Sequence, residues 1–145
     1  MPSPYKSNYG VTDWTAATLA VNAAAHAGMT IKSNLAATQT ATLPAATGSG
    51  NEYRFFVAIT KTGDLVIQVT TTDIMQGGVA IATDIAGVVM LAGGTADTIT
   101  LNGTTKGGVK GSLLRFQDVA SGIWSVEGFL VSTGVEADPF SAAVS

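Results

Sequence analysis

Apolar side chains recur at every second position in several short stretches of this chain, as in strands that bury one face. The first clear stretch carries Tyr53, Phe55, Val57 and Ile59, and the next carries Leu65, Ile67 and Val69. Thr62-Gly63-Asp64 lies between the two stretches and has the composition of a turn. The two stretches therefore predict a β-hairpin.

Further short strands are predicted on both sides of this hairpin. Residues 30–33, 40–43 and 98–101 each have strand-like composition, and 47–50 (Thr-Gly-Ser-Gly) predicts a flexible turn. The run from Ile85 to Leu91 is wholly apolar and contains two adjacent valines, which favours a buried strand over a helix.

The clearest hairpin lies near the end of the chain. Leu114 and Phe116 belong to its first strand, and Ala120-Ser121-Gly122 forms its turn. The second strand is apolar on both faces, because Trp124, Val126 and Leu130 alternate with Ile123, Phe129 and Val131. Such a strand is expected inside a sandwich or at a contact between subunits.

The two ends of the chain lack a clear period. Residues 1–16 predict an N-terminal arm in which Tyr5, Tyr9 and Trp14 are candidate partner contacts, because aromatic side chains often anchor such segments. The alternative is that Trp14 packs on its own domain. Residues 17–28 predict a strand followed by one helical turn at 23–27, and the tail 133–145 is expected to be extended.

These elements amount to roughly eight to ten short strands separated by turns, the number typical of an all-β domain. We expect a β-sandwich or a jelly-roll-like fold, with one domain over residues 17–145 and the arm before it.

Composition adds a second constraint. Charged residues make up only 12% of the 145 residues, about half of the roughly 25% found in typical soluble domains. A surface with so few charges suits a chain that is largely covered in an assembly. The cations are scattered and the net charge is −3, so we do not expect a nucleic-acid partner.

The start of the chain lacks the apolar stretch of a signal peptide, and the apolar run 85–92 is too short to span a bilayer. We therefore expect a soluble protein made in a cytoplasm, without a membrane partner. The absence of cysteine excludes disulfides and thiolate sites.

No residue pattern predicts catalysis or a cofactor. The single histidine, His26, cannot form a zinc site alone, so a capping or packing role is expected. The Gly103–Gly108 segment lacks the order of a phosphate-binding loop and is interpreted as a turn. The carboxylates are dispersed in predicted turns, where turn formation is the ordinary role and calcium binding the alternative; they are Asp73, Asp84, Asp97, Asp118, Glu127, Glu136 and Asp138.

Several segments resemble head decoration and structural proteins of tailed bacteriophages. The resemblance runs from about Leu19 to Ala142, and the matching segments are 42–50 (TLPAATGSG), 53–57 (YRFFV), 73–78 (DIMQGG), 97–103 (DTITLNG), 122–126 (GIWSV) and 139–142 (PFSA). It implies a sandwich or jelly-roll-like subunit, commonly a trimer, that binds the major capsid protein on the capsid exterior of the virion. It supplies no catalytic residues.

The function expected from this resemblance is that of a capsid decoration (cement) protein that stabilises the head. The alternative is a tail-fibre, tail-tip or head-fibre module that binds a host surface or a glycan, with Trp14, Tyr53 and Trp124 as aromatic candidates. A small hydrolase is the third hypothesis, and it lacks a nucleophile with a base.

Overall fold

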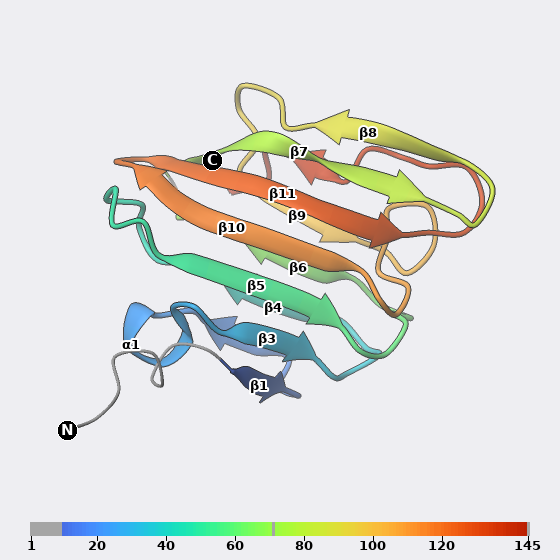
Figure 1. The fold of residues 1–145 in the computed structure, drawn as a ribbon, viewed down its shortest axis with the longest axis horizontal. Coiled ribbons are helices and arrows are strands. Elements are labelled where there is room, and N and C mark those ends of the chain that lie inside the picture. The colour runs from blue at the N-terminus through green and yellow to red at the C-terminus, as the bar shows by residue number, and fades with distance from the viewer. Residues whose placement is uncertain (1–9, 71, 145) are drawn as a thin grey trace.

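Two mixed β-sheets pack face to face in the computed structural model, which describes residues 10–70 and 72–144 (Figure 1). The expected all-β sandwich is thereby confirmed. Parallel strand pairs occur in both sheets, whereas a jelly roll is built from antiparallel strands. Of the two expected architectures, the sandwich is therefore the one observed.

The larger sheet has seven strands and the smaller sheet has five. The larger sheet contains, in spatial order, β1 (Val11–Trp14), β3 (Thr30–Ser33), β5 (Glu52–Val57), β10 (Leu113–Ala120), β11 (Ile123–Val131), β7 (Ile74–Ala82) and β8 (Gly87–Leu91). The smaller sheet contains β12 (Phe140–Ser141), β9 (Thr98–Leu101), β6 (Leu65–Gln68), β4 (Gln39–Thr42) and β2 (Thr18–Ala20). The expected helical turn is α1 (Ala23–His26), directly after β2.

The core lies between the sheets and takes its side chains from the alternating inward positions of both. Aromatic rings fill its larger-sheet side. Phe55 on β5 meets Phe116 on β10 edge to face at 5.8 Å, and Tyr53 lies 5.8 Å from Trp124 on β11. These contacts join three neighbouring strands, which explains why the segments with the strongest alternation form the centre of the sandwich.

The predicted hairpin of residues 53–60 and 65–69 is wrong. Both segments contain strands, but β5 belongs to the larger sheet and β6 to the smaller one. The chain crosses between the sheets at 58–64, and β6 pairs with β4 in parallel and with β9 in antiparallel orientation. A short turn-like segment is compatible with either connection, and buried side chains from both strands face the same core.

The same crossing is repeated along the first half of the chain. Strands β1, β3 and β5 lie side by side and parallel in the larger sheet, while β2, β4 and β6 do the same in the smaller sheet. Successive strands therefore alternate between the two sheets. The second half contains the antiparallel pairs β7–β8 and β10–β11, so the predicted C-terminal hairpin is confirmed.

The apolar run 85–91 forms a strand, as predicted, but the strand is not buried. β8 is the last strand of the larger sheet (Figure 1). Most of its side chains are exposed. Val89 is 68% exposed and Leu91 is 70% exposed. The sequence pattern predicted the strand correctly and its burial wrongly, because no second layer of the described residues lies over this edge.

The glycine pair 77–78 does not interrupt β7. Gly77 has a φ of +121°, and a Cβ at this position would lie 2.2 Å from the carbonyl oxygen of Val126 on β11. Only glycine permits both the backbone conformation and this close approach. The strand therefore continues through a position that composition alone marks as a break.

Residues 11–14 of the expected N-terminal arm belong to the sandwich. β1 pairs in parallel with β3, and Trp14 is only 3% exposed, at 6.3 Å from the Phe55 ring. Trp14 is thus a core residue and not a partner contact, which corrects the arm boundary at residue 16. Tyr5 and Tyr9 lie outside the described residues.

Trp14→Ala should lower the free energy of unfolding by about 3–5 kcal/mol, because it removes a large buried side chain and leaves a cavity. Val11→Ala is the matched control, since Val11 is on the same strand but 64% exposed. It should change stability by less than about 0.5 kcal/mol. Urea titration of both variants measures the difference, and equal small losses would contradict a core role for Trp14.

Candidate functional site

No other segment of the described residues packs over the outer face of the larger sheet, and cross-strand register places the side chains of this face in rows. One row is charged at its centre and runs from β1 to β8 through Val11, Thr30, Arg54, Arg115, Glu127, Gly78 and Leu91. The next row runs through Asp13, Lys32, Phe56, Leu113, Phe129, Ala80 and Val89. We refer to its last five members, Phe56 to Val89, as the apolar row.

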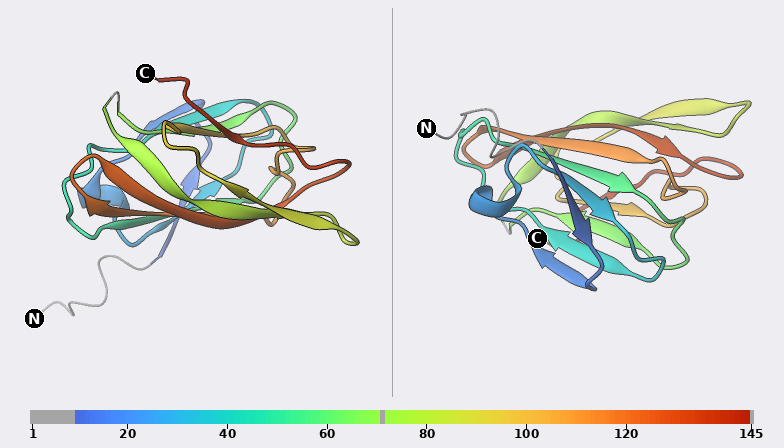
Figure 2. Two further views of the ribbon diagram at one scale, coloured as in Figure 1. Left: turned by 90° about the horizontal axis from the view of Figure 1, so that it is seen from above. Right: turned by 60° about the horizontal axis from the view of Figure 1, so that its bottom comes forward.

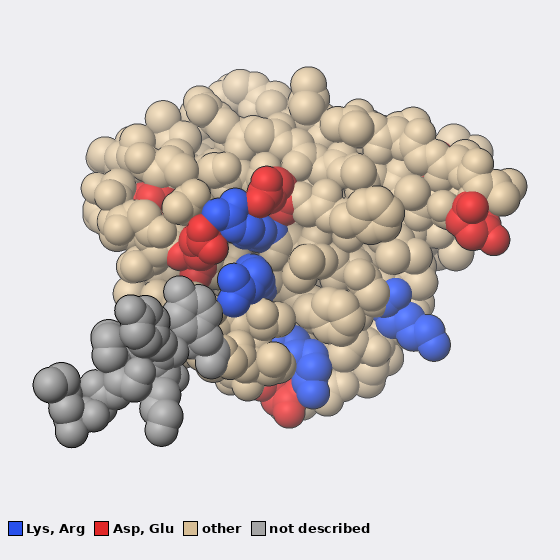
Figure 3. Space-filling view, in the orientation of Figure 1, with Lys and Arg blue, Asp and Glu red and all other residues tan. Residues whose placement is uncertain are grey.

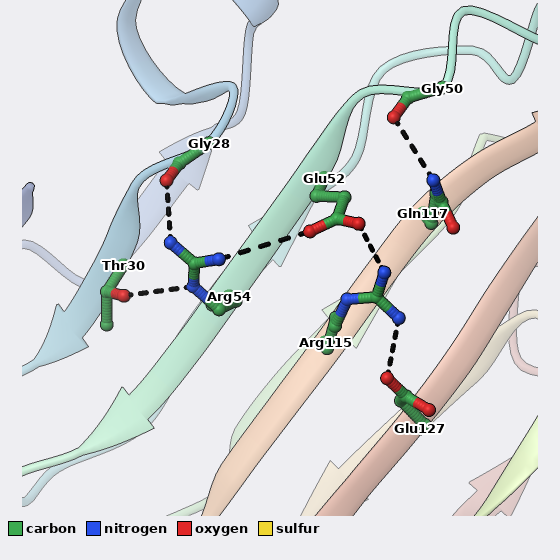
Figure 4. A network of polar contacts seen from close by, with 8 residues as sticks. All are labelled: Gly28, Thr30, Gly50, Glu52, Arg54, Arg115, Gln117 and Glu127. Carbon is green, nitrogen blue, oxygen red and sulfur yellow. Dashed lines mark hydrogen bonds and ion pairs between the residues drawn. The ribbon is translucent and has the colours of Figure 1, made fainter. Parts of the chain in front are cut away.

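Ion pairs neutralise the centre of the charged row (Figure 4). The Arg115 guanidinium donates to Glu127 at 2.5 Å and also to Glu52, which reaches over from the neighbouring strand. The hydrogen bond from Arg115 lowers the pKa of Glu52, and the same two carboxylates raise the pKa of Arg115. Arg115 therefore remains a cation that already has two anionic partners.

The second cation of the row is held in a different way. Arg54 lies directly opposite Arg115 in the register, an arrangement of like charges that is unfavourable without a counterion. Its guanidinium donates to the carbonyl oxygen of Gly28 at 2.7 Å and to the Thr30 hydroxyl at 3.2 Å, and it lies 3.9 Å from the Glu52 carboxylate (Figure 4). Both cations thus lose much of their capacity to attract a phosphate backbone.

Beyond this network the outer face carries few charges. Figure 3 shows most of the acidic and basic side chains of the face in one group, beside a wide surface without charge. In the apolar row, Phe129 is 56% exposed and Val89 is 68% exposed. A groove of about 370 Å³ lies between the two rows, with Arg54 and Arg115 on one side and Leu113 and Phe129 on the other.

A larger groove of about 680 Å³ lies at one end of the sandwich. The loop 83–86 between β7 and β8 forms one wall, and residues 131–136 after β11 form the other. Figure 2 shows these two segments projecting together from the sandwich. Ile85 is 92% exposed, and Val135 is also exposed, so the groove adds apolar surface next to the β8 edge.

An outer sheet face with exposed aromatic and aliphatic side chains beside a paired charge network is typical of a protein-binding surface. The apolar side chains can be buried by a partner, and the ion pairs can limit which surfaces fit. The larger groove contains Ser132 and Glu136, but the buried Ser132 hydroxyl makes no hydrogen bond to a base among the described residues.

Three carboxylates that could have formed a catalytic or calcium site instead hold separate loops. Asp73 accepts from the Ala46 N–H at 2.8 Å, and Asp97 accepts from the Ala143 N–H at 2.8 Å. Asp118 accepts hydrogen bonds from Gly48 and Ser49, in the loop that follows Ala46. No group of three His, Asp or Glu side chains placed to hold a metal ion occurs among the described residues.

Asp118 fixes the loop that its composition suggested was flexible. Its carboxylate accepts from the Gly48 N–H at 2.7 Å, the Ser49 hydroxyl at 2.7 Å and the Thr47 N–H at 3.0 Å. Burial alone would raise the pKa of Asp118, but the Ser49 hydroxyl and the backbone N–H groups outweigh it and lower that pKa. The carboxylate thereby ties residues 47–49 to β10, and the Gly50 N–H donates to the Asp118 backbone carbonyl at 2.8 Å.

A buried lysine was not identified from the sequence. Lys61, 3% exposed, lies in the crossing segment and donates to the Leu35 carbonyl at 2.5 Å and to Gln39 Oε1 at 3.1 Å. Ser33 donates to the same Gln39 oxygen at 2.6 Å, and the Gln39 amide donates to the Trp14 carbonyl at 2.9 Å. Burial lowers the pKa of Lys61 to about 8. A single lysine in a turn-like segment is not part of any local sequence pattern that predicts such a buried cluster.

His26 has the expected capping role, because its Nδ1 accepts from the Asn22 N–H at 3.0 Å at the start of α1. Of the candidate partner contacts, the structure thus places only Trp14, and it places that residue in the core. No helix in the described part of the chain is long and apolar enough to cross a bilayer. Comparison with family models, curated proteins and solved structures finds no match to this chain.

Asp118→Asn should lower the free energy of unfolding at pH 7 by about 2–3 kcal/mol, because an amide cannot accept every hydrogen bond that the carboxylate does. The lowered pKa means that the carboxylate stabilises the fold above its ordinary pKa of 3.8 and loses this effect as the pH falls through the folded-state pKa. Urea titrations of both proteins from pH 7 to pH 2 should therefore converge. A constant difference down to pH 2 would contradict this role.

Lys61→Met should make stability less dependent on alkaline pH. The folded protein releases the Lys61 proton near pH 8 and the unfolded chain near 10.5, so the wild type gains unfolding free energy between these values. Relative to Lys61→Met, the gain should approach about 3 kcal/mol at pH 10.5. Parallel pH dependences of the two proteins would show that Lys61 keeps its ordinary pKa.

Proposed function

We propose that this protein is a decoration (cement) protein of a tailed-bacteriophage head, which binds the outer surface of the major capsid protein lattice and stabilises the shell. The observation that carries the proposal is the apolar row on an outer sheet face that residues 10–70 and 72–144 leave uncovered. Its central members Leu113 and Phe129 face each other across β10 and β11, and both are exposed. Burial of such side chains provides the main favourable term in protein association.

The electrostatics of the face suit a protein partner. Glu52 and Glu127 already pair with Arg115, so nothing in this network favours a polyanion. A lattice also multiplies weak contacts, because an oligomer that engages several capsid subunits gains avidity. Because of this gain in avidity, the proposal includes the trimer that the family resemblance implies.

The segments that carry the resemblance contain residues that hold distant parts of the sandwich together. Asp73 and Asp97 each begin one such segment, and each fixes a distant backbone segment. Gly48 and Ser49, in another, are held by Asp118. The residues that carry the resemblance therefore have structural roles within the sandwich. The argument for binding rests separately on the exposed outer face.

The alternative of a glycan-binding module is not favoured by any observation. A sugar site needs an exposed aromatic ring, and the three candidates Trp14, Tyr53 and Trp124 are all buried. Among the described residues, the exposed aromatic side chains are Phe56 and Phe129, which lie in the apolar row and have no polar tip.

Phe129→Lys should weaken binding to expanded phage heads at least tenfold, because a charge would replace a side chain whose burial contributes about 1.5–3 kcal/mol. Ile59→Lys is the control, since Ile59 is exposed in the crossing segment and not on this face. Cosedimentation of each folded variant with heads that lack decoration measures binding. Failure of the wild type to bind, or equal loss in both variants, would contradict the proposal.

A further inference from the structure

β8 is an open sheet edge of an unusual kind. The two sheets end in four edge strands, β1, β8, β12 and β2. β8 has five residues, whereas β1 has four, β2 has three and β12 has two. From Ile85 to Gly93 the chain contains no charge and no proline, the two features with which proteins usually protect such edges.

The hydrogen bonds to β7 show which backbone groups face the open edge. The Thr83 N–H donates to the Ala86 carbonyl at 2.8 Å, and the Ala92 N–H donates to the Gly77 carbonyl at 2.9 Å. Because the direction alternates along a strand, the even-numbered positions 86–92 face β7. The N–H and C=O groups of Gly87, Val89 and Leu91 therefore point away from the sheet.

We propose that a second copy of this chain occupies the edge, with the two β8 strands antiparallel across a two-fold axis at Val89. This register pairs Val89 with Val89 of the second copy, and Gly87 with Leu91 of the second copy. Each facing pair would exchange both backbone hydrogen bonds, since all these groups point to the open edge. The two β7–β8 hairpins then form part of one sheet that continues through both subunits.

Self-complementarity is the reason for choosing a second copy. An interface with two-fold symmetry brings a patch against itself, so a charged patch would repel and an uncharged apolar patch does not. Gly87 leaves space for the Leu91 side chain that faces it. The other end of the larger sheet is less suitable, because Asp13 on β1 forms an ion pair with Lys32 at 2.9 Å and would be desolvated against apolar side chains.

The pairing also extends the apolar row. Val89 is the last member of that row, next to Ala80 on β7. Across the two-fold axis the apolar rows of both subunits would meet, giving one longer apolar surface. The contact is distinct from the proposed three-fold association and would connect neighbouring trimers. It does not depend on capsid binding.

Val89→Pro tests the pairing with little change inside the subunit. The Val89 N–H faces the open edge, so proline removes no hydrogen bond to β7, and proline is tolerated on edge strands. Sedimentation equilibrium should show self-association of the wild type at micromolar concentration and at least a tenfold higher dissociation constant for Val89→Pro. Val89→Lys, which keeps the backbone N–H but brings two charges together, should have the same effect.

Val119→Lys is the matched control, because Val119 is also exposed but lies on β10, separated from β8 by β11 and β7. It should associate like the wild type. The proposal predicts association at micromolar concentration. A wild type that is still monomeric at about 100 μM would therefore overturn it. Association that persists unchanged in both Val89 variants would overturn it equally.

Chemical cross-linking tests the symmetry directly. The chain has no cysteine, so Val89→Cys introduces a single thiol. A short bis-maleimide should link Val89→Cys into covalent dimers, because the two-fold axis brings the same residue of both copies together. Val119→Cys should remain uncross-linked under the same conditions. No dimer from Val89→Cys, or equal yields from both, would exclude the proposed register.

Discussion

A polar cluster between the two sheets holds the place where the chain crosses from one layer to the other. Lys61 in the crossing, Ser33 on β3 and Gln39 on β4 satisfy one another, and Gln39 also binds the end of β1 through the Trp14 carbonyl. A buried ammonium without acceptors would be strongly unfavourable. One set of side-chain hydrogen bonds therefore joins β1 and β3 of the larger sheet to β4 of the smaller sheet at this crossing.

The sequence predicted the elements better than their connections. Alternation at Tyr53, Phe55 and Val57 predicted β5 correctly, since a strand with one buried face has this pattern in any sheet. It could not predict which sheet receives the next strand, because Leu65 and Ile67 are equally buried in either arrangement. The decisive contacts of Lys61 are made with residues more than twenty positions away, and local patterns contain no such information.

The candidate binding face was predictable only in part. The two apolar sides of the strand 123–131 predicted cover on both faces, but only the inner face is buried, and Phe129 on the outer face is 56% exposed. The same reasoning failed for 85–91, where an apolar run was interpreted as burial within the chain. Hydrophobicity records that a side chain favours removal from water, not whether its own chain or another molecule removes it. This error concerns Val89 and Leu91, which are exposed on the face for which a partner is proposed.

The alternation of β1 to β6 between the sheets makes the first half of the molecule a short superhelical coil of three rungs. In coils of this type each rung is stabilised mainly by its neighbour, and order can be lost from an end stepwise. The outermost rung, β1 with β2, has only one neighbour. Its attachment therefore depends on the pairing of β1 with β3 and of β2 with β4, and on Trp14, which packs in the core.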